Sequence, residues 1–130
     1  MEPNSKYTIL SIDDEELYRQ MIDISLVFQG MKVIAAESGM KGLSLARSAK
    51  PDLILLDLVM PELDGVSVCR QIMADSTLRK IPVVVLSGSH DSDEIEACLQ
   101  MGAVDYLLKP FEPRLLGQVV QKHLNAKKSA

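Results

Sequence analysis

Tryptophan is absent from this chain, and cysteine is scarce. The 130 residues contain two cysteines, Cys69 and Cys98, without the CxxC spacing of a redox or metal motif. Each falls on the apolar stripe of an expected helix, so we predict two reduced core thiols rather than a disulfide or a metal pair. The net charge of -4 leaves no basic surplus, which argues against direct binding of nucleic acid or of a membrane by this chain.

Long hydrophobic segments are missing as well. Residues 1–6 contain no apolar core of a secretion signal, and the aliphatic runs are far shorter than the ~20 residues that span a bilayer. We therefore expect a cytoplasmic protein. The chain length suits one domain, since domains commonly contain about 100–200 residues. We assign this domain to residues 7–125, with short tails at 1–6 and 126–130.

The most apolar stretch is residues 53–56, four large aliphatic side chains in a row that lead into Asp57. Pro51 and Pro61 bracket this stretch, which predicts a short strand buried on both faces inside a parallel sheet. Asp57 then lies at the carboxyl edge of a central strand. Open α/β sheets bind their ligands at this edge, so we expect Asp57 to take part in the chemistry of a site.

Four further strands are expected, and an amphipathic helix follows each of the five. The strands are predicted at residues 7–12, 31–37, 53–57, 81–86 and 103–108. Strict alternation of strand and helix predicts a parallel sheet with helices on both faces and right-handed crossovers. For five strands, the expected α/β fold is the flavodoxin-like, doubly wound (βα)5 arrangement with sheet order 2-1-3-4-5.

The first helix has an apolar stripe at helical spacing. Leu17, Met21, Ile24 and Phe28 recur every three or four residues, and we expect this stripe to be the buried face. Gly30 is a natural stop for the helix.

Helix caps are predicted at two other positions. Ser38 is expected to cap the second helix. Asp91, with Glu94 three residues later, resembles a capping box at the start of the fourth helix.

Polar side chains end the strands at one edge of the expected sheet. They are Asp13 and Asp14 after the first strand, Asp57 on the third, Ser87 on the fourth and Lys109 on the fifth. In the order 2-1-3-4-5 the first and third strands are adjacent, so the three carboxylates converge. Clustered carboxylates repel one another, and Mg²⁺ would relieve this repulsion while accepting a phosphate oxygen. With a lysine and a hydroxyl nearby, the set favours phosphoryl transfer onto Asp57 as the nucleophile.

Taken together, these motifs resemble the receiver domain of two-component response regulators, the CheY-like family. The motifs are Asp13-Asp14, Asp57 to Pro61 with Asp64-Gly65, Ser87-Gly88, Gly102 to Tyr106, and Lys109-Pro110-Phe111. Each motif is weak alone, but their order, spacing and strand-end placement are specific. The match spans residues 7–125, nearly the whole chain.

The resemblance implies a switch operated by an aspartyl phosphate. Asp57 would take a phosphoryl group from the phosphohistidine of a sensor histidine kinase or of a phosphotransfer protein. Mg²⁺, for which Mn²⁺ can substitute, would be bound by Asp14, Asp57 and the Val59 backbone carbonyl, with Asp13 acting largely through water. Lys109 would pair with the phosphoryl group, and the family implies a cis peptide bond between Lys109 and the following proline.

Ser87 and Tyr106 are the implied switch residues. The Ser87 hydroxyl would move to the phosphoryl group and the Tyr106 ring would turn inward, reshaping the surface of the fourth helix, fifth strand and fifth helix. A downstream protein or an output domain would bind there. Such a domain is not an enzyme beyond its own phosphorylation and dephosphorylation. Ser87 departs from the commoner threonine, and Val59 places an apolar side chain beside the expected path of attacking water.

Other functions fit parts of the pattern. A flavin-binding module would need a phosphate loop after the first strand, where the acids at 13–16 would repel phosphate. A phosphatase of the haloacid-dehalogenase type usually carries a second aspartate where this chain has Val59. A regulator that acts alone and the receiver of a longer regulator, ahead of a cyclic-diguanylate synthase or DNA-binding domain, both remain open. His90 and His123 are most simply surface residues.

Overall fold

The computed structural model describes residues 7–88 and 91–129 and contains a five-stranded parallel sheet in the order β2-β1-β3-β4-β5. The strands are β1 (Thr8–Ile12), β2 (Lys32–Ala36), β3 (Leu53–Asp57), β4 (Val83–Ser87) and β5 (Asp105–Leu108). The helices are α1 (Glu16–Val27), α2 (Gly39–Ala49), α3 (Gly65–Ala74), α4 (Ser92–Met101) and α5 (Pro113–Ser129), with a 3₁₀ turn η1 (Leu78–Lys80). The predicted fold and sheet order are confirmed, and each strand ends within two residues of its expected position.

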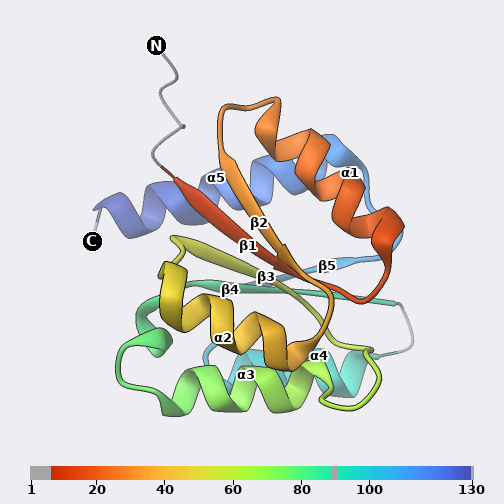
Figure 1. The fold of residues 1–130 in the computed structure, drawn as a ribbon, viewed down its shortest axis with the longest axis vertical. Helices are drawn as coiled ribbons and strands as arrows, with labels where there is room; N and C mark the ends of the chain where they lie inside the picture. The colour runs from red at the N-terminus through yellow and green to blue at the C-terminus, as the bar shows by residue number, and fades with distance from the viewer. Residues whose placement is uncertain (1–6, 89–90, 130) are drawn as a thin grey trace.

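The sheet separates two apolar cores. Helices α1 and α5 cover one face, while α2, α3 and α4 cover the other (Figure 1). Strands β3 and β4 are buried along their whole length, because helices cover both of their faces. Burying each large aliphatic side chain contributes roughly 1.5–3 kcal/mol, so these two strands form the most strongly held part of the sheet. Cys69 of α3 and Cys98 of α4 lie in the core as free thiols, as predicted.

The buried face of α1 differs from the predicted one. Ile22 and Leu26 face the core, whereas Leu17 is 76% exposed, Ile24 70% and Phe28 91%. Apolar residues occur on two sides of this helix, so their spacing alone does not select the side that packs. The contact of α1 with α5 and the sheet selects the Ile22 side, and the expected stripe is wrong.

Two glycines allow the second and third helices to lie very close to the sheet. A Cβ atom on Gly42 would lie 2.5 Å from Ile12 Cδ1, and one on Gly65 would lie 2.3 Å from the Asp57 carbonyl oxygen. Side chains at these positions would push the helices outward. At the same helix starts, Ser38 accepts a hydrogen bond from the Lys41 amide, as predicted, and Asp64 accepts one from the Ser67 amide.

The ends of α4 and α5 also depart from expectation. Asp91 occupies the N-cap position of α4, but its side chain makes no capping hydrogen bond, so the predicted capping box is wrong. Gly102 ends α4 with a φ of 133°, which favours glycine. Helix α5 continues to Ser129 through residues that we assigned to a C-terminal tail.

Candidate functional site

Three carboxylates meet where β1 and β3 end. Asp13 and Asp14 follow β1, Asp57 ends β3, and one ligand atom from each lies within 4.8 Å of the others. Asp13 and Asp57 are buried, whereas Asp14 is exposed. The predicted convergence is therefore present, and its cause is the adjacency of β1 and β3 in the sheet.

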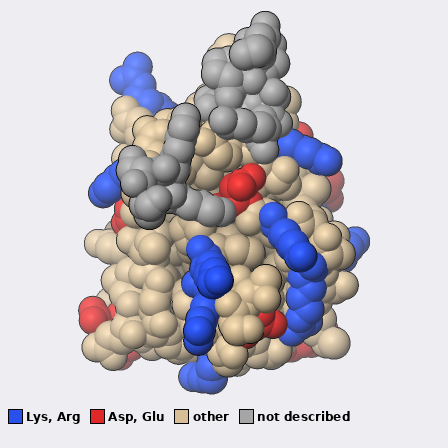
Figure 2. Space-filling view, turned by 90° about the vertical axis from the view of Figure 1, so that its left-hand side faces the viewer, with Lys and Arg blue, Asp and Glu red and all other residues tan. Residues whose placement is uncertain are grey.

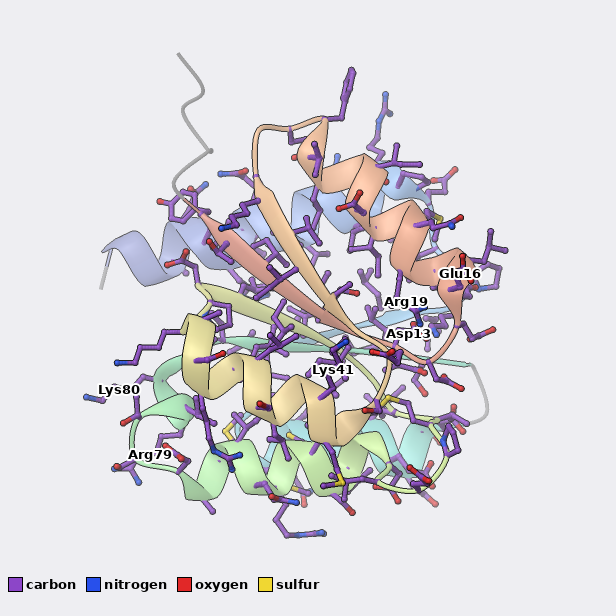
Figure 3. All side chains as sticks on the ribbon, viewed as in Figure 1. Asp13, Glu16, Arg19, Lys41, Arg79 and Lys80 are labelled. Atoms are coloured by element: carbon purple, nitrogen blue, oxygen red, sulfur yellow. The ribbon has the colours of Figure 1, made fainter. Side chains whose placement is uncertain are left out.

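The Asp13 carboxylate and backbone are both held in place. The Glu15 amide donates to Asp13 Oδ1 at 2.9 Å, and Arg19 Nη1 donates to the Asp13 carbonyl oxygen at 2.8 Å. Figure 3 shows Arg19 reaching from α1 toward Asp13, while Glu16 lies farther along at the start of the helix. Asp13 is thus a fixed charge at the base of the site.

Lys109 supplies the cation of the site. Its Nζ lies 2.8 Å from Asp13 Oδ2 and 3.2 Å from Asp57 Oδ1, and the side chain is 10% exposed. The ammonium also lies 4.1 Å from the centre of the Tyr18 ring. The Lys109–Pro110 bond is cis, as predicted. Burial alone would lower the pKa of Lys109, but the hydrogen bond to Asp13 and the two carboxylate charges raise it above its ordinary value.

Asp57 has an unusual carboxyl group. Burial and the neighbouring charge of Asp13 raise its pKa to about 7, although Lys109 and the Val59 amide act in the opposite direction. Its Oδ2 atom is buried and has no hydrogen-bond partner among residues 7–88 and 91–129. A buried acceptor without a partner is costly, which marks this oxygen as a candidate to contact a bound group.

Ser87 ends β4 and is buried. Its Oγ donates a hydrogen bond of 2.6 Å to Asp91 Oδ2, and the same oxygen accepts the Gly88 amide at 3.2 Å. Ser87 and Asp57 lie on neighbouring strands, and Asp57, Gly88 and Asp91 line one pocket. In this state the serine hydroxyl is directed to Asp91.

Tyr106 lies on β5 opposite Val85 of β4 and is 44% exposed, so its ring is turned outward. It lines a shallow groove with Leu108 of β5 and with Ile95 and Leu99 of α4. The predicted switch tyrosine therefore lies on the predicted output surface.

Comparison with known proteins decides the family. The model of the response regulator receiver domain matches residues 9–121. The chain is a response regulator receiver domain.

Relatives of this receiver domain include transcriptional regulators. It is 38% identical over 109 residues to the transcriptional regulatory protein AfsQ1 of Streptomyces coelicolor. The matched residues cover 84% of this chain and 47% of AfsQ1. It is 36% identical over 116 residues to the DNA-binding response regulator MtrA of Mycobacterium tuberculosis, covering 89% of this chain and 50% of MtrA. The chain spans about half the length of the curated relatives it matches.

Solved structures agree with this assignment. A response regulator receiver domain from Clostridium thermocellum superimposes with a TM-score of 0.87 at 31% identity, covering 94% of this chain and 97% of that one. The chemotaxis protein CheY4 of Vibrio cholerae gives a TM-score of 0.83 at 28% identity, covering 89% and 97%. Within the part of the receiver that the structure describes, no helix has both the length and the apolarity to cross a membrane.

Sequence reasoning missed several residues of the receiver pocket. Glu15, just before α1, places Oε1 3.2 Å from Lys109 Nζ. Tyr18 lines the pocket beneath the lysine. Helical periodicity identifies neither contact, because both depend on where the start of α1 lies relative to Lys109. Val59 is 62% exposed on the rim of the pocket, and its amide lies 3.5 Å from Asp57 Oδ1.

His123 of the receiver is not a simple surface residue. Its Nε2 lies 2.9 Å from Asp105 Oδ2, and its side chain is 13% exposed. Burial would raise the pKa of Asp105, but the hydrogen bonds from His123 and the Tyr106 amide outweigh it and lower that pKa. The pair connects α5 to the strand that carries Tyr106. His90 lies outside the described residues.

Several basic side chains lie at the far end of the sheet. Arg79 and Lys80 of η1 extend into solvent at the opposite end of the molecule from Asp13 (Figure 3), and Arg47 and Lys50 border a hollow near Leu78. Figure 2 faces that end and shows several Lys and Arg side chains across it. Acidic side chains occur at this end as well, since Asp75 borders the same hollow as Arg47 and Lys50.

Proposed function

We propose that Asp57 is the phosphoacceptor of this receiver domain. The observation that carries the proposal is the Asp57 carboxylate, whose Oδ1 lies 3.2 Å from Lys109 Nζ while its buried Oδ2 has no partner among the described residues. During transfer, an Asp57 oxygen attacks the phosphorus of a phosphohistidine. The new O–P bond forms as the N–P bond breaks, and the imidazole nitrogen keeps the electron pair of the broken bond.

The acidic cluster fits a small divalent cation, for which we propose Mg²⁺, with Mn²⁺ able to substitute. Asp13, Asp14 and Asp57 offer oxygen atoms close enough to share one ion. We assign direct coordination to Asp14, Asp57 and the Val59 backbone carbonyl, and contact through water to Asp13. When bound, the ion would neutralise charge on the carboxylates and on the phosphoryl oxygens.

Lys109 has a second task once Asp57 is modified. A phosphoryl group adds a charge of roughly -1.5 to -2, which needs a nearby cation in a site that already contains acids. Lys109 already lies against both Asp13 and Asp57, so a short movement of its Nζ suffices to pair with the phosphoryl oxygens. The Ser87 hydroxyl, on the neighbouring strand, is the proposed hydrogen-bond donor.

The proposed output is a change in the surface formed by α4, β5 and α5. Movement of Ser87 toward the phosphoryl group would vacate space that the Tyr106 ring can enter from its outward position. The proposed partners are a sensor histidine kinase or phosphotransfer protein as donor, and a downstream protein or output domain as receiver of the signal, in the cytoplasm. Since AfsQ1 and MtrA are named as regulators of transcription or DNA-binding proteins, a DNA-binding output domain is one such partner.

Acetyl phosphate with Mg²⁺ provides the test of the phosphoacceptor. We expect the wild type to gain the mass of one phosphoryl group, which is lost at alkaline pH as acyl phosphates are. Asp57→Asn should gain none. Asp93→Asn is the matched control, because Asp93 is an exposed acid in the first turn of α4, and this variant should react as the wild type does. Equal labelling of Asp57→Asn would refute the assignment.

A further inference from the structure

The carboxylate of Asp91 is turned away from the helix that it should cap. Asp91 stands at the N-cap of α4 with φ -105° and ψ 33°, outside the extended region typical of capping residues. Its Oδ2 instead accepts the Ser87 hydroxyl at 2.6 Å and the Gly88 amide at 3.2 Å. The Asp91 carboxylate can therefore accept hydrogen bonds either from the first amides of α4 or from the residues at the end of β4. In this state it accepts them from the end of β4.

The hydrogen bond to Asp91 occupies the only proton that Ser87 can donate. A serine hydroxyl carries one O–H, so Ser87 cannot donate to Asp91 and to a phosphoryl group at the same time. A hydrogen bond from a hydroxyl to a carboxylate is short and about twice as strong as a neutral one, as the 2.6 Å separation illustrates. Phosphorylation must break this bond before Ser87 can respond.

We propose that Asp91 is a latch that holds Ser87 in the unphosphorylated receiver, and that its release allows the same carboxylate to cap α4. This inference rests on the proposed phosphorylation of Asp57. Asp91 lines the pocket that contains Asp57, so a phosphoryl group there would compete for the Ser87 proton and repel the Asp91 carboxylate. The free amides and positive dipole end of α4 offer that carboxylate a favourable alternative.

The latch connects the pocket to the output surface by a second route. Helix α4 contributes Ile95 and Leu99 to the groove that also contains Tyr106. Capping by Asp91 would order the first turn of α4, which directly precedes Ile95. Ser87 would thus act on the groove both through the space available to Tyr106 and through the start of α4.

Beryllofluoride, a mimic of the phosphoryl group, allows the latch to be measured without a kinase. Its apparent affinity in the presence of Mg²⁺ includes the cost of releasing Ser87 from Asp91. We expect Asp91→Ala to bind it roughly ten- to a hundredfold more tightly, the size of effect given by one hydrogen bond to a charged group. Asp91→Asn keeps an acceptor without the charge and should fall between the two. Asp93→Ala removes an acid from the same turn without touching Ser87, and it should change the affinity by less than about twofold.

A double-mutant cycle separates the latch from simple charge repulsion. In a Ser87→Ala background there is no proton to compete for, so adding Asp91→Ala should tighten beryllofluoride binding clearly less than it does in the wild type, through relief of charge repulsion alone. Equal tightening in both backgrounds would show that Asp91 acts only through its charge and would overturn the latch. Thermal unfolding of each variant without beryllofluoride checks that the variant is folded. If Asp91→Ala is not folded, Asp91→Asn replaces it in the cycle.

Amide exchange tests the capping half of the proposal. Beryllofluoride should slow exchange at the amides of residues 93 and 94 in the wild type, and it should not do so in Asp91→Ala. Unchanged exchange at these amides in the wild type would refute capping. Failure of the wild type to bind beryllofluoride at all would instead refute the phosphoacceptor role of Asp57, an outcome distinct from binding that is insensitive to Asp91.

Discussion

The ammonium of Lys109 lies 2.8 Å from the buried carboxylate of Asp13, although 96 positions separate the two residues in the sequence. This pair joins the end of β5 to the end of β1, and Asp57 lies between them in the sheet. The receiver pocket is therefore held together by charge before any phosphoryl group arrives.

Replacing Lys109 with alanine should destabilise the metal-free protein. The change leaves Asp13 and Asp57 buried without their cation, and breaking a buried ion pair from one side typically costs about 3–5 kcal/mol. Denaturant unfolding in EDTA measures the loss. The control is Lys41→Ala, whose exposed pair with Glu37 should contribute less than about 1 kcal/mol. Similar losses for both variants would contradict the buried-pair interpretation.

Mg²⁺ should stabilise the receiver near neutral pH. An ion bound only by the folded state adds ~2.7 kcal/mol at a hundredfold excess over its dissociation constant. Melting curves with millimolar Mg²⁺ and with EDTA measure the difference, and Asp14→Ala should remove most of it. Superimposable curves for the wild type would argue against a cation site at these carboxylates.

The stability of the metal-free protein should depend on the charge of Asp57. Its pKa of about 7 lies above the ordinary value of 3.8 for an aspartate, so the folded state holds this proton more tightly than the unfolded state does. The stabilisation from this group is complete below pH ~4 and is lost as the pH rises through ~7. At about 1.4 kcal/mol per pKa unit, the free energy of unfolding should fall by at most about 4 kcal/mol over this range. Lys109 remains charged throughout this range.

Unfolding in EDTA from pH 5 to pH 8 should therefore show a decline for the wild type that Asp57→Asn lacks. The asparagine variant should also be the more stable protein at pH 8. Parallel pH profiles for the two proteins would mean that Asp57 is already ionised in the metal-free state.

Ser11 offers a way to stabilise the sheet. It is buried in β1, and its hydroxyl has no partner within residues 7–88 and 91–129. Ser11→Ala should raise the free energy of unfolding by about 1 kcal/mol, because an unsatisfied buried hydroxyl carries a desolvation cost. Ser38→Ala is the contrasting variant, since it removes a helix cap and should lower stability by about 1 kcal/mol. A loss in both variants would indicate that Ser11 has a bonding partner.

The residues that sequence alone could place are those whose position follows from the order of the strands. Asp13, Asp57 and Lys109 end strands whose apolar runs are plain in the sequence, and the sheet order then brings them together. Tyr18 could not be placed in this way, because its contact with Lys109 depends on which side of α1 packs. Because apolar side chains occur on two sides of α1, their spacing does not reveal which side is buried. Phe28, on the side that we expected to be buried, is exposed.

Side chains with two competing partners were also beyond prediction. Asp91 has the sequence signature of a cap, but the Ser87 hydroxyl and the Gly88 amide compete with the helix for its carboxylate. His123 resembles a solvated histidine until α5 folds against the start of β5 and brings it to Asp105. In both cases the deciding partner is a tertiary neighbour that local sequence does not identify.

The close packing at Gly65 gives the pocket two sides of unequal stiffness. Helix α3 begins against the backbone of Asp57 and Leu58, where even a methyl group would lie 2.3 Å from the Asp57 carbonyl oxygen, and the Gly65 amide is bonded to the Leu58 carbonyl. That side cannot move without moving Asp57 itself. The side formed by Ser87, Gly88 and Asp91 is held by side-chain hydrogen bonds that can exchange. The phosphoryl group that we propose for Asp57 would therefore displace the α4 side rather than the α3 side, and the architecture would give the signal its direction.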